Sequence, residues 1–189
     1  PVFQSVNKEL ISLLNSGGSA ILSLGPDGVA PDKGGNIPFG FSTIFWNTAW
    51  TSGQPPHTLG ILCNPDHPVF RFFPTDYYTN YQWWDIVSQA QPLLLDGLDP
   101  APGPLVRIID DWFTNRNLGL VIEARVGSGK LIITGTDLTH HLDTRLAAKQ
   151  LLYSIRKYML SNNFKPVNTL SLEQITSFCA AKSRSGKNS

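Results

Sequence analysis

The segment from Leu118 to Thr136 places the strongest constraint on the fold. Its sequence, LGLVIEARVGSGKLIITGT, holds two apolar runs rich in branched side chains around Gly127-Ser128-Gly129. Two such runs on either side of a short glycine-containing turn predict a β-hairpin. The chain therefore contains an antiparallel pair of strands late in its sequence.

Helical periodicity is clearest directly after this hairpin. Residues 144–160 are predicted to form a helix, because apolar side chains recur on one face at Ala147, Leu151, Ile155 and Tyr158. Asp143 or Thr144 is expected to cap it. Residues 172–178 predict a short amphipathic helix, and the polar basic residues after it predict a disordered tail.

The rest of the chain alternates strand and helix patterns. A helix is expected at residues 3–14 and buried strands at 20–24, 59–63 and 105–109, with a weaker strand at 87–95 that contains Pro92. This pattern predicts an α/β fold, specifically a flavodoxin-like three-layer α/β/α arrangement with a mostly parallel sheet and a late antiparallel hairpin. The domain is expected at residues 1–165, followed by the short helix and tail at 166–189.

The first predicted element is a helix, although α/β folds built from βαβ units start with a strand. We therefore expect that the sequence is cut from a longer protein and that its opening strand is missing. The sheet should then show an open edge or slot beside residues 20–24.

Composition excludes some partners. The net charge of +1 gives no electrostatic argument for binding nucleic acid or an anionic membrane. The apolar runs are far shorter than the ~20 residues of a membrane span, and the helical pattern at the start of the sequence is not expected to be a signal peptide. Cys63 and Cys179 are expected to be two separate thiols, because nothing in their spacing favours a disulfide.

Several catalytic motifs are incomplete. GSGK at 127–130 resembles the end of a phosphate-binding loop, but the required earlier glycine and following Ser or Thr are replaced by Ala124 and Leu131. Cys63 follows a predicted strand, where α/β sheets place their sites, but no glycine-rich elbow surrounds it. A buried structural thiol is the simpler interpretation.

Carboxylates and histidines at strand ends are also candidates. A glycosidase needs two carboxylates facing one sugar, and Asp110-Asp111 and Asp137 follow predicted strands, although Asp there usually caps a turn. His140-His141 lies near Asp137 and Asp143, but adjacent histidines do not converge on one metal from a regular element. No catalytic residue, metal site or cofactor is predicted.

An aromatic stretch is the most unusual feature. Thirteen of the 20 aromatic residues lie between Phe39 and Trp84, interleaved with Asn, Gln and Asp. Rings beside amides and carboxylates suit sugar binding, although packing of a long loop onto the sheet or burial against a neighbouring domain is the more common role of such rings. We expect Phe41, Phe45, Phe70 and Phe73 to be core. The predicted binding residues are Trp46, Trp50, Asp76, Tyr78, Tyr81, Trp83, Trp84 and Asp85.

The same segments carry a family resemblance. In order they are FSTIFWNTAW, LGILCNPDHPVFRFFPTD, NYQWWD, RIIDDWFTNRNLGLVIEARVGSGKLIITGTDL and RLAAKQLLYSIRKYM. They resemble the carboxy-terminal region of large bacterial family 2 glycoside hydrolases, often β-galactosidase-like with a sugar-binding domain. That region is similar to class I glutamine amidotransferase-like domains, which have a flavodoxin-like fold.

The resemblance implies an accessory role. The amidotransferase cysteine and its elbow have no counterpart here, and the glycosidase Glu pair would belong to a barrel domain upstream. The leading hypothesis is a non-catalytic accessory domain of a periplasmic or extracellular glycoside hydrolase. It would brace the enzyme's other domains or help hold glycan, without nucleic acid or membrane partners. The alternatives are a small hydrolase or amidotransferase-like enzyme using Cys63, Asp110, Asp137 and His140, and a pure interaction module.

Overall fold

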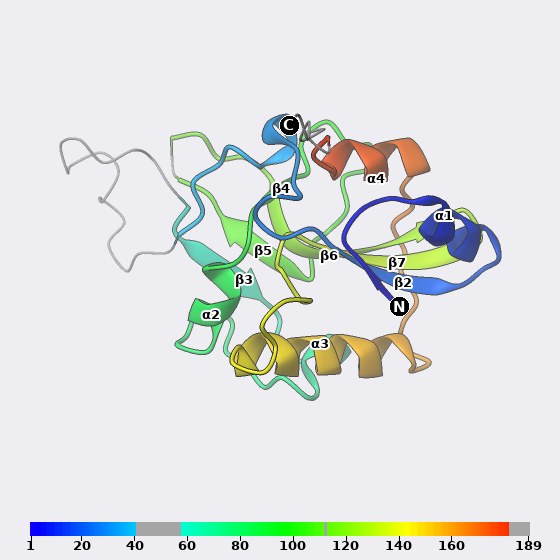
Figure 1. Ribbon diagram of the computed structural model, residues 1–189. Coiled ribbons are helices and arrows are strands. Elements are labelled where there is room, and N and C mark those ends of the chain that lie inside the picture. The colour runs from blue at the N-terminus through cyan, green and yellow to red at the C-terminus, as the bar shows by residue number, and fades with distance from the viewer. Residues whose placement is uncertain (41–57, 112, 182–189) are drawn as a thin grey trace, which may run out of the picture.

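The computed structural model describes residues 1–40, 58–111 and 113–181 and shows an α/β fold (Figure 1). In these residues one mixed sheet holds seven strands in the order β1-β2-β7-β6-β5-β3, with β4 paired to β6. The strands are β1 (Val2–Phe3), β2 (Ser19–Ser23), β3 (Gly60–Cys63), β4 (Leu93–Leu94), β5 (Val106–Ile109), β6 (Leu118–Val126) and β7 (Gly129–Thr134). The α-helices are α1 (Lys8–Asn15), α2 (Trp83–Val87), α3 (Leu146–Met159) and α4 (Leu172–Phe178).

Strand direction corrects the expectation of a mostly parallel sheet. β1, β2 and β7 run parallel, whereas β7-β6, β6-β5, β5-β3 and β4-β6 are all antiparallel pairs. The hairpin is the reason, because β6 reverses direction between β7 and β5. The reversal therefore occurs inside the sheet and not at its edge.

Two apolar cores lie on opposite faces of this sheet. Alternate residues of the central strands divide between them, so that Ile132 of β7 joins one core while Leu131 and Ile133 join the other. α3 and Trp83 of α2 pack into the first core, and α1 and α4 pack into the second. Figure 1 shows α3 and α4 on opposite sides of the strands. Helices therefore cover both faces.

Several elements agree with the sequence-based expectations. The hairpin turns between Val126 and Gly129 as predicted, with Gly127 at a φ of 57°. α3 and α4 form where the periodicity places them, and the strands predicted at 59–63 and 105–109 form as β3 and β5. Residues 87–95 are not one strand: α2 ends at Val87, and β4 contains two residues after Pro92.

The empty slot expected beside β2 is absent from the described sheet, and the first helix begins later than predicted. Val2 and Phe3 form β1, which pairs in parallel with Ile21 and Leu22 of β2 and occupies the side of β2 where an empty slot was expected. The first helix begins only at Lys8, because the Asn7 side chain accepts the Leu10 amide and caps it there.

The carboxy-terminal segment packs as part of the same body. Residues 168–170 hydrogen-bond to Arg125 of β6, and Phe178 and Ala180 bond to the loop at residues 28–30. Ile175 and Phe178 of α4 are fully buried in the second core. Among the described residues no helix has the length and apolar character needed to cross a membrane.

Candidate functional site

The aromatic segment divides between the core and the surface. Trp83 was predicted to be a surface residue, but it is fully buried, and its indole N–H donates to Thr75 Oγ1 at 2.7 Å. Its ring meets Phe70 and Phe73 edge-on, and both of these are buried as expected. Trp83 faces inward because it lies on the same face of α2 as Ile86 and Val87.

The neighbouring rings face solvent as predicted. The exposed fractions are 62% for Tyr78, 94% for Tyr81 and 61% for Trp84. Tyr81 and Trp84 line a surface hollow of about 360 Å³ together with Thr79 and Asn80. The three-residue spacing of Tyr81 and Trp84 brings the two rings to one side of the turn that leads into α2. Trp46 and Trp50, with Phe41 and Phe45, lie outside the described residues.

Asn80 supplies the polar part of this hollow. Its amide nitrogen donates to Asp76 Oδ2 at 3.1 Å, so exposed Asp76 fixes the orientation of the amide. Asn80 Oδ1 is buried and has no hydrogen-bond partner in the described part of the chain. A buried carbonyl oxygen without a donor is costly, and this one reaches a ligand only when the Asn80 side chain turns toward the hollow.

Asp85 was predicted to bind ligand, but the structure gives it a structural role. Its Oδ1 accepts from Arg145 Nε at 2.9 Å, and its Oδ2 accepts from the Ala148 amide at 3.3 Å. Ala148 lies in the first turn of α3, so Asp85 caps that helix from α2. The sequence-based assignment of the cap to Asp143 or Thr144 is wrong, because Arg145 occupies the cap position and its own side chain makes no cap hydrogen bond.

Asp110 and Asp111 stabilise the loop after β5. Asp110 receives two 2.8 Å bonds from the Arg116 guanidinium and a third from the Arg116 amide. Asp111 is fully buried and accepts the amides of Phe113 and Thr114. Burial alone would raise the pKa of Asp110, but the bonds from Arg116 outweigh it and hold that pKa below its ordinary value. These carboxylates behave as turn residues.

Cys63 lies at the other end of the neighbouring strand from Asp110. Because β3 runs antiparallel to β5, the carboxyl end of β3 lies beside Val106 and away from Asp110. The thiol is buried and donates to the Asp76 carbonyl at 3.3 Å. Burial raises its pKa to about 11, so the thiolate is scarce at neutral pH. Cys63 and Cys179 are free thiols.

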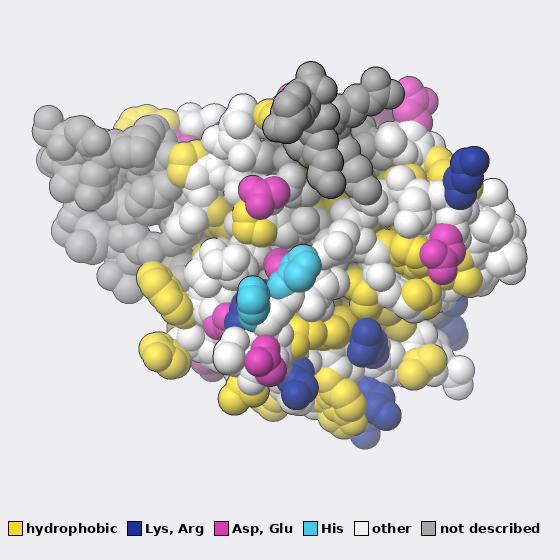
Figure 2. All heavy atoms as spheres, viewed as in Figure 1, with side chains coloured by type: hydrophobic (Ala, Val, Ile, Leu, Met, Phe, Trp, Pro, Cys, Tyr) yellow, Lys and Arg dark blue, Asp and Glu magenta, His cyan; other side chains and the backbone are white. Residues whose placement is uncertain are grey.

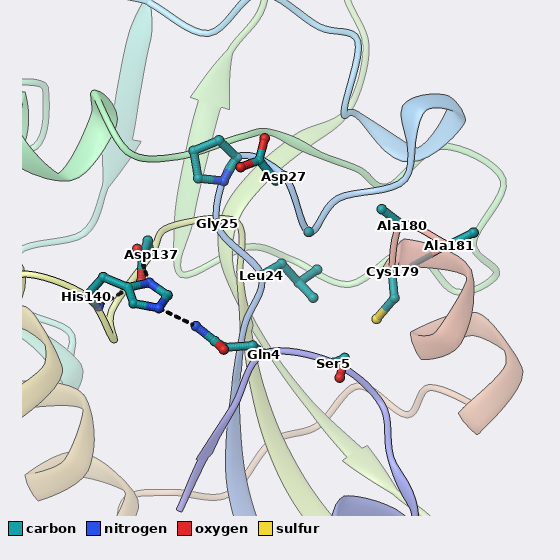
Figure 3. Close-up of a pocket in the computed structure, with 12 residues that line it drawn as sticks. Gln4, Ser5, Leu24, Gly25, Asp27, Asp137, His140, Cys179, Ala180 and Ala181 are labelled. Atoms are coloured by element: carbon teal, nitrogen blue, oxygen red, sulfur yellow. Dashed lines mark hydrogen bonds and ion pairs between the residues drawn. The ribbon is translucent and has the colours of Figure 1, made fainter. Parts of the chain in front are cut away.

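Asp137 and His140 are the two strand-end candidates that the structure brings together. Asp137 Oδ2 lies 2.8 Å from His140 Nδ1, and Oδ1 accepts the amides of Thr139 and His140. The Gln4 amide nitrogen approaches His140 Nε2 at 3.2 Å. Figure 3 shows these three side chains at one side of a pocket, across from Cys179 and Ala180.

His141, the second histidine of the pair, gives no evidence of a metal site. His141 is exposed, has a φ of 54°, and does not line this pocket. Figure 2 shows histidine side chains at the surface with acidic and basic side chains beside them. Within the described residues no group of three or more His, Cys, Asp or Glu could hold a metal ion.

One known protein family matches almost the whole chain. The family described as "Domain of unknown function (DUF8487)" matches residues 1–180. The chain belongs to this family. No curated protein matches the sequence. The match includes α4 and its contacts with the loop at residues 28–30.

Two functional candidates in this DUF8487 domain escaped the sequence analysis. Gln4 fell within the helix expected at residues 3–14 and was given no role, and it meets His140 only because β1 and β7 flank β2 in the sheet. Asn80 was noted only as one of several polar residues. Its position three residues before Trp83, whose amide donates to the Asn80 carbonyl, is a local signal that could have separated it from the others.

Proposed function

We propose that this domain is a non-catalytic accessory domain of a glycoside hydrolase, and that it binds carbohydrate through the hollow at Asn80, Tyr81 and Trp84. The observation that carries the proposal is the pairing of two exposed rings with the unpartnered Asn80 oxygen. A ring covers the C–H face of a pyranose, and the Asn80 amide oxygen, which is buried in the free domain, accepts a hydroxyl once its side chain turns toward the hollow.

The site has the features of a surface that holds rather than transforms a ligand. It lies on a turn supported by buried Trp83 and by the bond from Trp83 to Thr75, so its backbone is fixed. The described residues that line it, Thr79, Asn80, Tyr81 and Trp84, supply apolar faces and neutral polar groups. Binding residues on a loop supported by a rigid scaffold are a common arrangement.

The layered arrangement of helices and sheet also supports the proposal. Helices on both faces of the sheet support a flavodoxin-like three-layer arrangement related to class I glutamine amidotransferase-like domains. The antiparallel pairs on the β6 side are a departure that such a relationship must accommodate. The proposed partners are other domains of a β-galactosidase-like, periplasmic or extracellular hydrolase and its polysaccharide substrate.

The rival enzyme hypothesis has less support. Of its four residues, Cys63 has a protonated thiol and lies at the end of β3 away from Asp110, and Asp110 is held by Arg116. Asp137 and His140 remain in contact with each other. Their arrangement supports ligand binding in the separate pocket that Asp137 and His140 line.

The test is glycan binding by the domain and two single variants. Binding to a panel of plant and microbial polysaccharides is measured by affinity electrophoresis, and Kd for a positive oligosaccharide by calorimetry. Tyr81→Ala and Trp84→Ala should each weaken binding about tenfold, equivalent to roughly 1.4 kcal/mol of lost stacking. Asn80→Ala should weaken it by a similar factor.

The matched control is Tyr153→Ala. Tyr153 is an exposed ring of α3 that does not line the hollow, so its removal should leave Kd unchanged. All variants are checked for an unchanged melting temperature. If the wild-type domain retains no glycan, or if the Tyr81 and Trp84 variants bind as well as Tyr153→Ala does, the aromatic hollow is not a carbohydrate site.

A further inference from the structure

A second pocket lies where three parallel strands end. Gln4 and Ser5 follow β1, Leu24 and Gly25 follow β2, and Asp137 comes shortly after β7. The pocket has a volume of about 470 Å³, within the range of small-molecule sites. In open α/β sheets, ligands bind at the carboxyl ends of parallel strands. The position and the size both fit a ligand site.

The imidazole of His140 is held in one tautomer. An ionised carboxylate only accepts hydrogen bonds, so the 2.8 Å contact with Asp137 Oδ2 places a proton on Nδ1. Hydrogen bonds from Thr139 and His140 outweigh the effect of burial and lower the pKa of Asp137, which keeps its carboxylate ionised. In the neutral ring Nε2 is then an acceptor, and the Gln4 amide nitrogen at 3.2 Å donates to it.

Gln4 holds the place of a ligand group. Its amide nitrogen also donates to Thr139 Oγ1 at 2.7 Å, and Thr139 Oγ1 donates to Asp137 Oδ1 at 2.8 Å. The Gln4 side chain is exposed and lies in the segment between β1 and α1. When this exposed side chain turns aside, it exchanges its bonds to Thr139 and His140 for bonds to water, and Nε2 becomes open to a hydroxyl group.

The charges around the pocket select the ligand chemistry. None of its described lining residues is Lys or Arg, whereas Asp27 and Asp137 both line it. Arg145 lies nearby, but its guanidinium donates to the carbonyls of Asp137 and His140 and is paired with Asp85. The described lining therefore offers no cation to a phosphate or a carboxylate, whereas it offers hydroxyl groups an imidazole nitrogen, an amide, a serine hydroxyl and a carboxylate.

We propose that this pocket binds a neutral polyhydroxylated small molecule of monosaccharide size, and that His140 Nε2 accepts a hydrogen bond from one of its hydroxyl groups. Asp137 is a positioning residue that fixes the ring. The site is separate from the aromatic hollow, and the proposal does not depend on glycan binding there.

The experiment measures the tautomer of His140 and the response of its ring nitrogens to added ligand. Long-range ¹H–¹⁵N correlation spectra of the ¹⁵N-labelled domain assign the tautomer of His140, and D-glucose, D-galactose and myo-inositol are titrated separately. We expect a Nδ1–H tautomer, with a saturable shift of the Nε2 resonance for at least one probe. Asp137→Asn should give mixed tautomers and a larger Kd.

His140→Asn and His141→Asn are the matched pair. Asn tolerates the left-handed backbone of residue 141, so His141→Asn should keep Kd within about twofold, while His140→Asn should raise it about tenfold or more. The double variant Tyr81→Ala/Trp84→Ala should retain the His140 response, which separates this site from the aromatic hollow. The proposal is overturned by a Nε2–H tautomer in the native domain, by the absence of a His140 response to every probe, or by equal binding in His140→Asn.

Discussion

Burial decides the chemistry of Cys63. The thiol is only 6% exposed, donates to the Asp76 carbonyl, and has a pKa raised to about 11 by loss of solvation. The neighbouring residue Leu62 is 47% exposed, since alternate residues of a strand point to opposite faces. One step along β3 therefore separates a core thiol from a surface side chain.

At this scale we predict that Cys63→Ser lowers the free energy of unfolding by about 1–2 kcal/mol, because a hydroxyl is less well suited than a thiol to an apolar site. Urea unfolding measures the loss. Cys179→Ser, at a half-buried position, is the control and should cost less. Native Cys63 should react slowly with a thiol reagent at neutral pH, and rapid labelling with a depressed pKa would contradict this assignment.

Side-chain contacts from α2 stabilise the first turn of α3. Arg145 is largely buried and joins Asp85 of α2 to the loop that carries Asp137 and His140. Asp85 in turn accepts the Ala148 amide. The start of α3 is thus stabilised by α2, and this contact connects the helix that carries Trp84 to the loop beside the strand-end pocket.

We predict that Asp85→Asn destabilises the domain by about 1–2 kcal/mol, through loss of a half-buried ion pair and a weaker helix cap. Asp143→Asn is a stringent control, because Asp143 is the cap that the sequence pattern favours. It is exposed in the structure, and its change should stay within about 0.5 kcal/mol. Thermal and urea unfolding compare the two variants. Equal losses would show that Asp85 does not cap α3.

Across the whole molecule, buried carboxylates couple stability to pH. The pKa values of Asp110 and Asp137 are lowered because hydrogen bonds from Arg116, Thr139 and His140 outweigh burial. Their stabilising contribution is therefore complete above their ordinary pKa of 3.8 and is lost as pH falls through the folded values. Burial raises the pKa of Glu123 although Tyr158 donates to it, so its protonation favours the folded state.

We predict that stability changes little from about pH 7 to pH 5 and then falls below about pH 4. Asp110→Asn should lower stability at neutral pH by about 2 kcal/mol and should flatten the decline in acid, because the group that gains a proton is gone. Urea unfolding over a pH series tests both. An Asp110→Asn variant with the wild-type acid slope would show that the bonds from Arg116 contribute nothing to the pH dependence.

Local patterns in the sequence determined the elements that depend on neighbouring residues. The hairpin at Gly127-Ser128-Gly129, the helix at α3 and the short helix at α4 follow from turn chemistry and helical spacing. The exposure of Tyr81 and burial of Phe73 also agree with their residue types. The α/β class followed from the alternation of such patterns.

The tertiary structure alone decided what depends on contacts between distant segments. The strand order places β6 between β7 and β5, and β6 runs antiparallel to both. This placement makes the sheet mixed. The inward face of Trp83, the cap supplied by Asp85, and the meeting of Gln4 with His140 each join groups through packing. The spacing of residues in the sequence does not predict these contacts, because they depend on which strands pair and on which side of the sheet each helix buries its apolar face.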